Sequence, residues 1–385
     1  MRTRSFKVSG RELPLPSHQR NQTTLEIDSV PRKYFLRRST LTPAEEISRY
    51  LAVNSKNILL VDAKVWKTLA KNISISPKRL IIVEASEQYK SLQHGVLPLV
   101  DALMAAGISK SEQLIVVGGG IVQEVAAFAA CIYRRGIPWV LFPTTLLSMS
   151  DSCIGGKAAV NYAGAKNQLA LYYSPKEVIL CSQFLETLPG SEISSGLGEI
   201  FKSCLLGGDD CFAEYRTTVG DKKTSSDITV LTDLAWLSLL IKKTIVETDE
   251  FESDLRRVLN YGHTLGHVIE SLSNYIIPHG FAIVAGILIV NKMAVHRGLL
   301  SPENEALIRQ HGQTLISDHI SELAHLNLDA LAKFLSQDKK NEGQDLTFVM
   351  LKTPGESGFQ KIANNDALHQ EIQAIYRHLF RSSTS

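Results

Sequence analysis

The sequence lacks the features that define several classes of protein. Its five cysteines lie apart with no C-x-x-C pair, which argues against a disulfide framework and a thiolate zinc site and indicates a reducing compartment. No uninterrupted apolar run approaches the roughly 20 residues that span a bilayer. The 41 Lys and Arg residues nearly balance the 39 Asp and Glu residues, so no overall positive field favours nucleic acid. We therefore expect a cytoplasmic protein without nucleic-acid or membrane partners.

The pattern of the chain changes twice along its 385 residues, which are enough for two domains. Residues 1–22 are basic and polar, lack the apolar core of a secretory signal, and are expected to form a flexible leader. In residues 23–180, short apolar runs alternate with helical stretches, which predicts an α/β domain with a parallel sheet. Residues 181–385 show mainly helical periodicity and predict a mostly α-helical domain. We expect the site in the cleft between these domains.

The stretch from Arg256 to His267 gathers several polar side chains within an apolar run. These are Arg256, Asn260, His263 and His267. If the stretch is one helix, their intervals of four, three and four place them on one face. Two histidines one turn apart can share a metal ion, or one can bind metal while the other transfers protons. The alternative is a helix with two hydrogen-bonded core histidines.

A catalytic metal would need further ligands from elsewhere in the chain. Glu199 lies in a segment of small and apolar residues, where an unpaired carboxylate would be costly, and His279 opens an apolar helical stretch. With His263 they would form a His₂Glu set with an open position, as in catalytic zinc sites. Glu252 and Glu270 are rival carboxylates.

A glycine turn follows one of the predicted strands and indicates a nucleotide site. Gly118, Gly119 and Gly120 would let the backbone approach a pyrophosphate at a helix N-terminus, although tight packing explains them equally well. Asp62 and Glu84, at the ends of two other strands, could bind ribose hydroxyls or could be ordinary cap or turn residues.

Lysines and amides gather in later segments and indicate a phosphate site. The glycine-led segment 151–168 holds Asp151, Lys157, Asn161, Lys166 and Asn167. Further lysines of the same kind are Lys202, Lys242, Lys339 and Lys340. The alternative for each lysine alone is a solvated surface residue.

Six motifs, in order, resemble the 3-dehydroquinate synthase branch of the sugar phosphate cyclases. They are GGG-x₃-E, RRGI-x₄-FPTTLLSMSDSCIGGKAAVN, AKN, LP-x₆-GLGEIFK, LNYGHTLGHVIE and PHG, and the resemblance covers about residues 25–351. It implies a nucleotide-binding α/β domain, a helical metal-binding domain, bound NAD⁺, catalytic Zn²⁺ or Co²⁺, and a homodimer. The implied substrate is a phosphorylated sugar acid.

The resemblance also implies a role for individual residues. Metal ligands are Glu199, His263 and His279, and His267 transfers protons. Phosphate is contacted by Lys157, Asn167 and Lys340 (or Lys339), and by Arg135 across the dimer interface. The substrate's hydroxyls and carboxylate are held by Asp151, Lys166, Lys202, Lys242, Arg256 and Asn260. The NAD⁺ positions are Asp62, Glu84, Lys90, Gly118, Gly119, Glu124, Thr144 and Thr145.

The implied reaction is cyclisation of 3-deoxy-arabino-heptulosonate 7-phosphate by transient oxidation with NAD⁺, loss of phosphate, re-reduction and aldol closure to 3-dehydroquinate. Arg256 would pair with the substrate carboxylate, which glucose 6-phosphate lacks. The intact Gly266-His267 pair argues against a valiolone-type cyclase. A cyclase of secondary metabolism, making amino-dehydroquinate or a cyclitol, remains an alternative.

Three features depart from the family pattern. Phe281 replaces the Glu of H-G-E after the third metal ligand, Gln123-Glu124 replaces Gly-Asp after the glycine turn, and the leader is long.

Two alternative functions lie outside the cyclase reaction. The chain could be a metal-dependent alcohol or glycerol dehydrogenase, or an inactive homologue. The lysine cluster argues against the first, and the complete ligand set with His267 argues against the second.

Overall fold

The computed structural model describes residues 4–16, 22–30, 33–219, 227–336 and 345–381. Contacts within the chain separate it into two compact units. Unit 1 comprises Met1–His18, Gly190–Val230 and Leu234–Ser385, and unit 2 comprises Gln19–Pro189 and Leu231–Asp233. The chain therefore enters unit 2 only after its first residues have contributed to unit 1.

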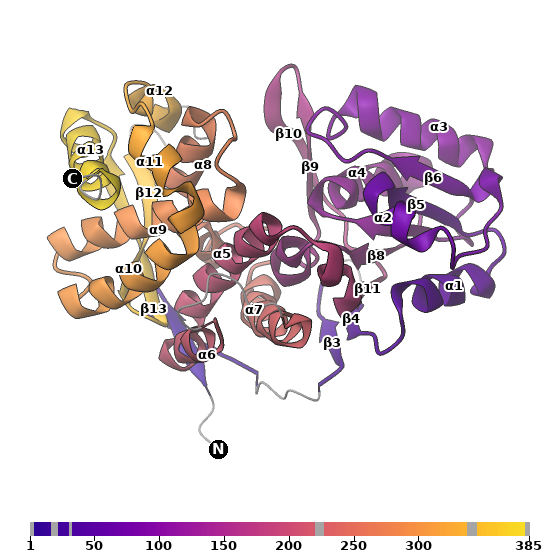
Figure 1. Ribbon diagram of the computed structural model, residues 1–385, viewed down its shortest axis with the longest axis horizontal. Helices are drawn as coiled ribbons and strands as arrows, with labels where there is room; N and C mark the ends of the chain where they lie inside the picture. The colour runs from indigo at the N-terminus through magenta and orange to yellow at the C-terminus, as the bar shows by residue number, and fades with distance from the viewer. Residues whose placement is uncertain (1–3, 17–21, 31–32, 220–226, 337–344, 382–385) are drawn as a thin grey trace. The chain divides into compact units, whose positions relative to one another are not determined.

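Unit 2 is built on a seven-stranded sheet with the order β3-β4-β11-β8-β7-β5-β6, in which every neighbouring pair except β3–β4 is parallel. Figure 1 shows these strands in indigo to magenta among their helices. Their bounds are β3 Thr24–Ile27, β4 Tyr34–Arg38, β5 Ile58–Asp62, β6 Leu80–Val83, β7 Leu114–Gly118, β8 Trp139–Pro143 and β11 Glu177–Leu180. All residues of β5, β7 and β8 are buried, as expected for parallel strands covered on both faces. The prediction of an α/β domain is confirmed.

The helices of unit 2 begin at recognisable sequence signals. Thr42 and Glu45 form a capping box at the start of α1, and Asp62 caps α2 through hydrogen bonds from two backbone N–H groups. The α-helices are α1 Pro43–Val53, α2 Ala63–Leu69, α3 Leu97–Ala105 and α4 Gly120–Ile132. The shorter helical turns are η1 Pro77–Arg79, η2 Leu92–Val96, η3 Tyr133–Arg135, η4 Ser148–Ser152 and η5 Ser182–Thr187.

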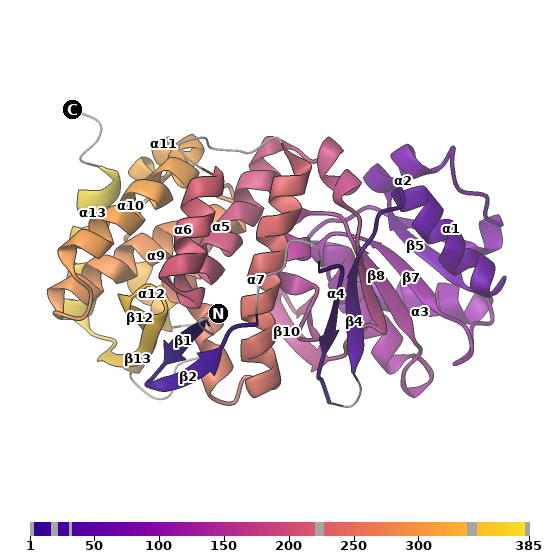
Figure 2. The same ribbon diagram turned by 90° about the horizontal axis from the view of Figure 1, so that it is seen from below.

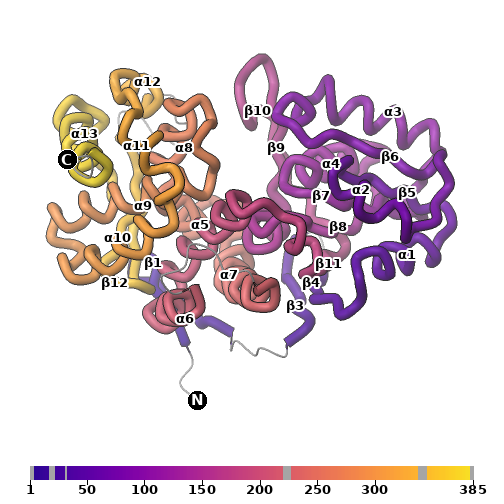
Figure 3. The backbone as a smooth tube through the Cα atoms, in the orientation of Figure 1, coloured from indigo at the N-terminus to yellow at the C-terminus, as the bar shows by residue number. Residues whose placement is uncertain are grey.

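A separate hairpin follows η4 in unit 2. It joins β9 Lys157–Tyr162 to β10 Ala165–Tyr172 in an antiparallel pair, and its tip stands away from the seven-stranded sheet in Figure 3. Ala163 and Gly164 make the turn with φ of 50° and 78°. The segment expected to form a glycine-led turn is therefore a turn followed by two strands.

Unit 1 is organised around α9 His279–His296, whose side chains from Gly280 to Met293 are mostly buried. It packs against α5, α8, α10 and α13. It is also the one helix among the described residues that is long and apolar enough to cross a membrane, but 78% of it is buried inside the protein. Burial in the core of unit 1 thus accounts for the apolar composition of α9.

The remaining helices of unit 1 are α5 Gly190–Gly207, α6 Asp209–Val219, α7 Ile228–Thr248, η6 Leu255–Asn260, α8 His263–Leu272, α10 Pro302–Ile316, η7 Ser317–His319, α11 Ile320–His325, α12 Leu331–Ser336 and α13 Asp366–Phe380.

Unit 1 also contains a four-stranded sheet, although its sequence predicts mainly helices. Its order is β12-β13-β1-β2, with β1 parallel to β13, and Figure 2 shows indigo β1 and β2 beside the β12–β13 hairpin. The bounds are β1 Ser5–Val8, β2 Arg11–Pro14, β12 Asp345–Thr353 and β13 Glu356–Ala363. Part of the expected flexible leader is therefore ordered, because Phe6, Val8 and Leu13 bury their side chains in unit 1.

The stretch from Arg256 to His267 is not one continuous helix, so that prediction is wrong. The 3₁₀ turn η6 ends at Asn260, and α8 begins at His263. Between them Gly262 has a left-handed φ of 78°, a conformation that interrupts a right-handed helix and that glycine adopts without strain. His263 and His267 therefore share α8, one turn apart, whereas Arg256 and Asn260 lie on η6.

Candidate metal and cofactor sites

Glu199 and His279 come together because α5 and α9 approach each other closely at two glycines. A Cβ on Gly280 would lie 1.8 Å from the Ser195 carbonyl oxygen, and a Cβ on Gly198 would lie 2.5 Å from the Gly280 carbonyl oxygen. The Gly280 N–H also donates to the Ser195 hydroxyl at 3.1 Å. This backbone contact sets the α5 carboxylate beside the first residue of α9.

The predicted metal ligands converge in unit 1. The ligand atoms of Glu199, His263 and His279 all lie within 4.8 Å of one another. Glu199 Oε1 is 3.2 Å from His279 Nε2 and 3.6 Å from His263 Nε2. His263 Nδ1 lies 3.1 Å from the Tyr261 carbonyl oxygen, so an Nδ1–H tautomer donates there and leaves Nε2 for a metal. Two imidazoles and a carboxylate fit Zn²⁺ or Co²⁺.

Charge at this cluster is balanced by neighbouring side chains. Lys202 Nζ is 2.5 Å from Glu199 Oε2, and the two side chains are 2% and 1% exposed. Burial lowers the pKa of His279, but hydrogen bonds to Glu199 and Glu270 outweigh it and raise the pKa to about 10. The two carboxylates thus favour the protonated imidazole, and a metal ion at Nε2 would compete with that proton.

His267 and Glu270 lie on the same helix beside the cluster. The ring centroids of His263 and His267 are 5.3 Å apart, and His267 is exposed. An exposed imidazole next to a metal ligand is suited to exchanging protons with solvent. Glu270 Oε1 lies 3.3 Å from His279 Nδ1, and His267, Glu270 and His279 form a second group with metal-ligand spacing.

The remaining predicted substrate residues of unit 1 are largely buried. Lys242 is 6% exposed and Arg256 is 1% exposed. Hydrogen bonds hold both the backbone and the side chain of Arg256. Its backbone N–H donates to Asp249 Oδ2 at 2.9 Å, and its guanidinium donates to the Glu250 carbonyl oxygen. Asn260 Nδ2 donates to Glu252 Oε1 at 2.8 Å, so Glu252, a rival ligand by sequence, instead orients an amide.

In unit 2 the sheet has a point at which its connections diverge. The crossover after β5 leads through α2 to β6, whereas the crossover after β7 leads through α4 to β8 on the opposite side. Ligands of open α/β sheets bind at such a point, at the carboxyl ends of the strands. Asp62 ends β5 and Gly118 ends β7, so two predicted cofactor residues stand there.

The N-terminus of α4 is suited to a phosphate group. Gly119 caps it without a side chain, so the first N–H groups of the helix remain for another acceptor. Thr144 extends this edge, since its N–H donates to the Gly118 carbonyl oxygen at 3.1 Å, and the Thr145 hydroxyl lies 2.8 Å from that of Ser148. Asp62 itself caps α2, which is the alternative that the sequence left open.

Both residues that replace the family's Gly-Asp pair have specific partners. Lys90 Nζ lies 2.5 Å from Glu124 Oε2. Burial raises the pKa of the Glu124 carboxyl, although the positive charge of Lys90 opposes that shift. Gln123 is 4% exposed, donates to the Ser152 carbonyl oxygen at 2.7 Å and accepts from the Ser152 hydroxyl at 3.0 Å. It thereby holds the η4 turn that carries Asp151.

Other predicted residues of unit 2 lie at the surface. Lys157, Arg135 and Glu84 are exposed. Lys166 pairs with Glu87 at 3.0 Å, and the Asn167 N–H donates to Asn161 at 3.0 Å from a backbone with φ of 53°. Lys339 and Lys340 lie outside the described residues.

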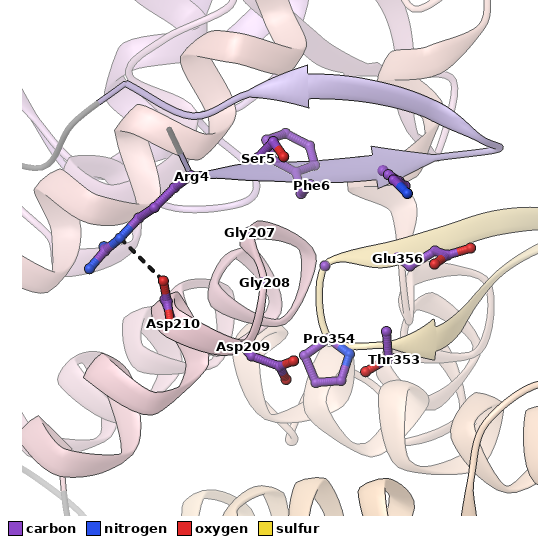
Figure 4. A pocket seen from close by; sticks show the side chains of 12 residues that line it. Arg4, Ser5, Phe6, Gly207, Gly208, Asp209, Asp210, Thr353, Pro354 and Glu356 are labelled. Atoms are coloured by element: carbon purple, nitrogen blue, oxygen red, sulfur yellow. Dashed lines mark ion pairs between the residues drawn. The ribbon is translucent and has the colours of Figure 1, made fainter. Parts of the chain in front are cut away.

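A hollow of about 450 Å³ in unit 1 is lined by β1, the α5–α6 junction and the β12–β13 turn (Figure 4). Arg4 reaches Asp210 across it at 3.5 Å. The predicted site residues are not among its described lining residues. The backbone beside the hollow joins two elements of unit 1. The Gly355 N–H donates to the Leu205 carbonyl oxygen and so links the β12–β13 turn to α5.

Asp249 holds the backbone of Arg256 and is a residue of the site that the sequence did not predict, because it carries no local signal. Glu270 was expected only as a rival metal ligand and Gln123 only as a departure from the family pattern, but Glu270 contacts His279 and Gln123 holds η4. Glu270 lies seven positions after His263 on α8, a spacing of two helical turns that places both on one face and could have indicated this contact.

Comparison with known proteins identifies the family. The 3-dehydroquinate synthase N-terminal profile matches residues 80–195, and the C-terminal profile matches residues 196–341. A 3-dehydroquinate synthase of Streptococcus pyogenes serotype M5 (strain Manfredo) is 38% identical over 289 residues, which are 75% of this chain and 79% of that protein.

Solved structures share the fold. A 2-deoxy-scyllo-inosose synthase complexed with carbaglucose-6-phosphate, NAD⁺ and Co²⁺ superposes with a TM-score of 0.77 at 23% identity, over 92% of this chain and 100% of that one. The 2-epi-5-epi-valiolone synthase of Streptomyces hygroscopicus subsp. jinggangensis 5008, with NAD⁺ and Zn²⁺ bound, gives 0.72 at 23% identity, over 93% of this chain and 99% of that one. On the profile and sequence matches, the chain belongs to the 3-dehydroquinate synthase family of carbon–oxygen lyases.

Proposed function

We propose that the chain converts 3-deoxy-arabino-heptulosonate 7-phosphate to 3-dehydroquinate and phosphate. The observation that carries this proposal is the convergence of Glu199, His263 and His279 in a chain of this family. Buried Lys202 beside that cluster adds a cation for an anionic substrate. Buried Arg256 supplies the planar donor group that a carboxylate prefers.

Glu199, His263 and His279 would hold Zn²⁺ or Co²⁺. When bound, such an ion polarises a coordinated oxygen and stabilises negative charge on it. Around it, His267 exchanges protons with solvent from its exposed imidazole. Lys202 and Asn260 donate hydrogen bonds to substrate oxygens, and Lys242 and Arg256 bind its anionic groups.

NAD⁺ would lie at the divergence point of the sheet in unit 2. When bound, it supplies reversible hydride transfer, so that the net reaction is not a redox change. The N-terminus of α4 after Gly119 binds its pyrophosphate, and Asp62 accepts from a ribose hydroxyl. Thr144, Thr145, Gly118, Glu84 and the Lys90–Glu124 pair complete the proposed cofactor contacts.

In this proposal, Lys157 and Asn167 of the β9–β10 hairpin bind the phosphate of the substrate, together with Lys340 (or Lys339) and with Arg135, which serves the partner subunit of a homodimer. Asp151 on η4 and Lys166 on the hairpin contact the hydroxyl and carboxylate groups of the substrate. Sedimentation of the purified protein at micromolar concentration is expected to give a dimer. The five free cysteines agree with a cytoplasmic location.

The test is phosphate release by purified protein with NAD⁺ and Zn²⁺. The heptulosonate phosphate, sedoheptulose 7-phosphate and glucose 6-phosphate are offered separately, and each product is identified by mass. Release from the first alone, with dehydroquinate formed and no NADH accumulating, is expected. Release from either of the others would replace the substrate assignment by a cyclitol-type reaction. Accumulation of NADH would replace it by a dehydrogenase.

Replacement of Arg256 by Ala tests the carboxylate assignment. We expect the variant to lose about 2–5 kcal/mol of substrate binding, because a buried charge pair is broken. The measurement is the KM for the heptulosonate phosphate, and an unchanged KM would contradict the role of Arg256.

A further inference from the structure

The His279 imidazole lies between two carboxylates. Its Nε2 is 3.2 Å from Glu199 Oε1, and its Nδ1 is 3.3 Å from Glu270 Oε1. Glu199 comes from α5, whereas Glu270 comes from the last full turn of α8. One nitrogen therefore faces the proposed metal position and the other faces a carboxylate on a different helix.

We propose that Glu270 is the positioning residue for His279, an inference that rests on the proposed metal site. The Glu270 carboxylate accepts a hydrogen bond from Nδ1–H and so selects the tautomer in which the Nε2 lone pair points toward Glu199 and His263. Histidines that bind metals commonly donate their second N–H to a carboxylate in this way, which fixes the ring and increases the basicity of the ligating nitrogen.

The side chain at position 281 does not take part in this contact. Phe281 stands where the family pattern has the Glu of H-G-E, but its side chain is 2% exposed and its ring centroid is 4.5 Å from that of His319, so the position belongs to the core of unit 1. The carboxylate that lies beside His279 Nδ1 is that of Glu270 on α8.

The local backbone holds Glu270 in place for this role. Its carbonyl oxygen accepts from the Tyr275 N–H at 2.8 Å and from the Ser273 hydroxyl at 3.0 Å, which closes the turn that leads from α8 to α9. Its side chain is 15% exposed, so solvent competes little for the hydrogen bond. The chain continues from this turn directly to His279 at the start of α9, so one short connection joins the two partners.

The experiment measures Co²⁺ binding by wild-type protein and by the variants Glu270→Gln and Glu270→Ala. The readouts are metal stoichiometry, affinity by competition with a chelator, and the visible absorption of bound Co²⁺. We expect Glu270→Ala to bind one ion with affinity lowered by about 10–100-fold. Glu270→Gln is expected to recover part of that loss, because its amide oxygen can accept the same hydrogen bond. The intensity of the Co²⁺ absorption should persist in both, since the ligand count is unchanged.

Glu371→Gln is the matched control, because Glu371 contacts His296 Nδ1 at the same 3.3 Å in the same unit. It should leave the Co²⁺ affinity unchanged. Wild-type affinity in Glu270→Ala would overturn the inference, and so would a changed absorption intensity in Glu270→Gln, which would make Glu270 a direct ligand. Absence of Co²⁺ binding by the wild type would instead overturn the proposed metal site itself.

Discussion

Units 1 and 2 hold their charged side chains in different ways. In unit 1 the Lys202–Glu199 pair is 2% and 1% exposed, whereas in unit 2 the Lys166–Glu87 pair is 36% and 45% exposed. The first pair lies on one helix beside two histidines, and the second joins a hairpin to a loop. Buried charges depend on their neighbours for solvation, but exposed charges depend on water. The site in unit 1 is therefore expected to be preformed, and the surface residues of unit 2 to gain order when a phosphate binds.

The largest effect is expected from His263→Ala. Removing one of three protein ligands should abolish stoichiometric Zn²⁺ and reduce turnover by about a thousandfold or more, since a metal supplies several kcal/mol of charge stabilisation. Metal content and phosphate release are measured on the same preparation. Retention of one ion per chain in this variant would contradict the ligand assignment.

The buried charge pair can be broken by Lys202→Met, which keeps the length of the side chain. In metal-stripped protein we expect the free energy of unfolding to fall by about 3 kcal/mol, because the buried Glu199 carboxylate loses its ion pair with Lys202. Denaturant unfolding of both proteins at pH 7 measures the difference. A change below about 1 kcal/mol would mean that water reaches Glu199 and that the site is not preformed.

Asp249 offers an intermediate case at the start of the segment that carries Arg256. Burial raises the pKa of its carboxyl, but N–H groups of Asp254, Arg256 and Ser253 donate to it and lower the pKa to about 2, from 3.8. The pKa of the folded state is thus below that of the unfolded state. The stabilisation is present above about pH 4 and is lost as the pH falls through 2.

Replacement of Asp249 by Asn should therefore lower the free energy of unfolding by about 1–2 kcal/mol at pH 7, after allowance for solvent screening. The difference from wild type should shrink between pH 4 and pH 2. Unfolding curves across this range measure it. A difference that is constant with pH would show that the charge of Asp249 does not contribute.

Much of the fold follows from local sequence. Apolar runs such as Ile58–Asp62 and Leu114–Gly118 predicted buried parallel strands, and both are confirmed. The β1–β13 pairing escaped prediction because its partners are about 350 residues apart and neither has a local signal for the other. The order of the first residues likewise depends on an edge that only the folded unit 1 provides.

The candidate site likewise combines features that local sequence predicts with features that depend on tertiary packing. The four-residue spacing of His263 and His267 predicted their shared face, but periodicity did not reveal the break at Gly262, which depends on a single left-handed residue. The resemblance predicted Glu199, His263 and His279 as metal ligands, and the structure brings their ligand atoms together. The resemblance did not indicate that two glycines on α5 and α9 bring Glu199 to His279, because that contact is a property of packing.

The smallest effect on stability is expected from Lys166→Met, the same substitution as in the buried pair. Because Lys166 and Glu87 are both more than a third exposed, the free energy of unfolding should change by at most about 1 kcal/mol. The KM for the heptulosonate phosphate should nevertheless rise, and added salt should reduce the difference from wild type, since a partly exposed cation acts on an anionic substrate through screened attraction. Denaturant unfolding and steady-state kinetics at two salt concentrations measure both properties. If Lys166→Met destabilised the protein as much as Lys202→Met, exposure would not explain the contrast between the two units, and the hairpin would be part of the structural core of unit 2.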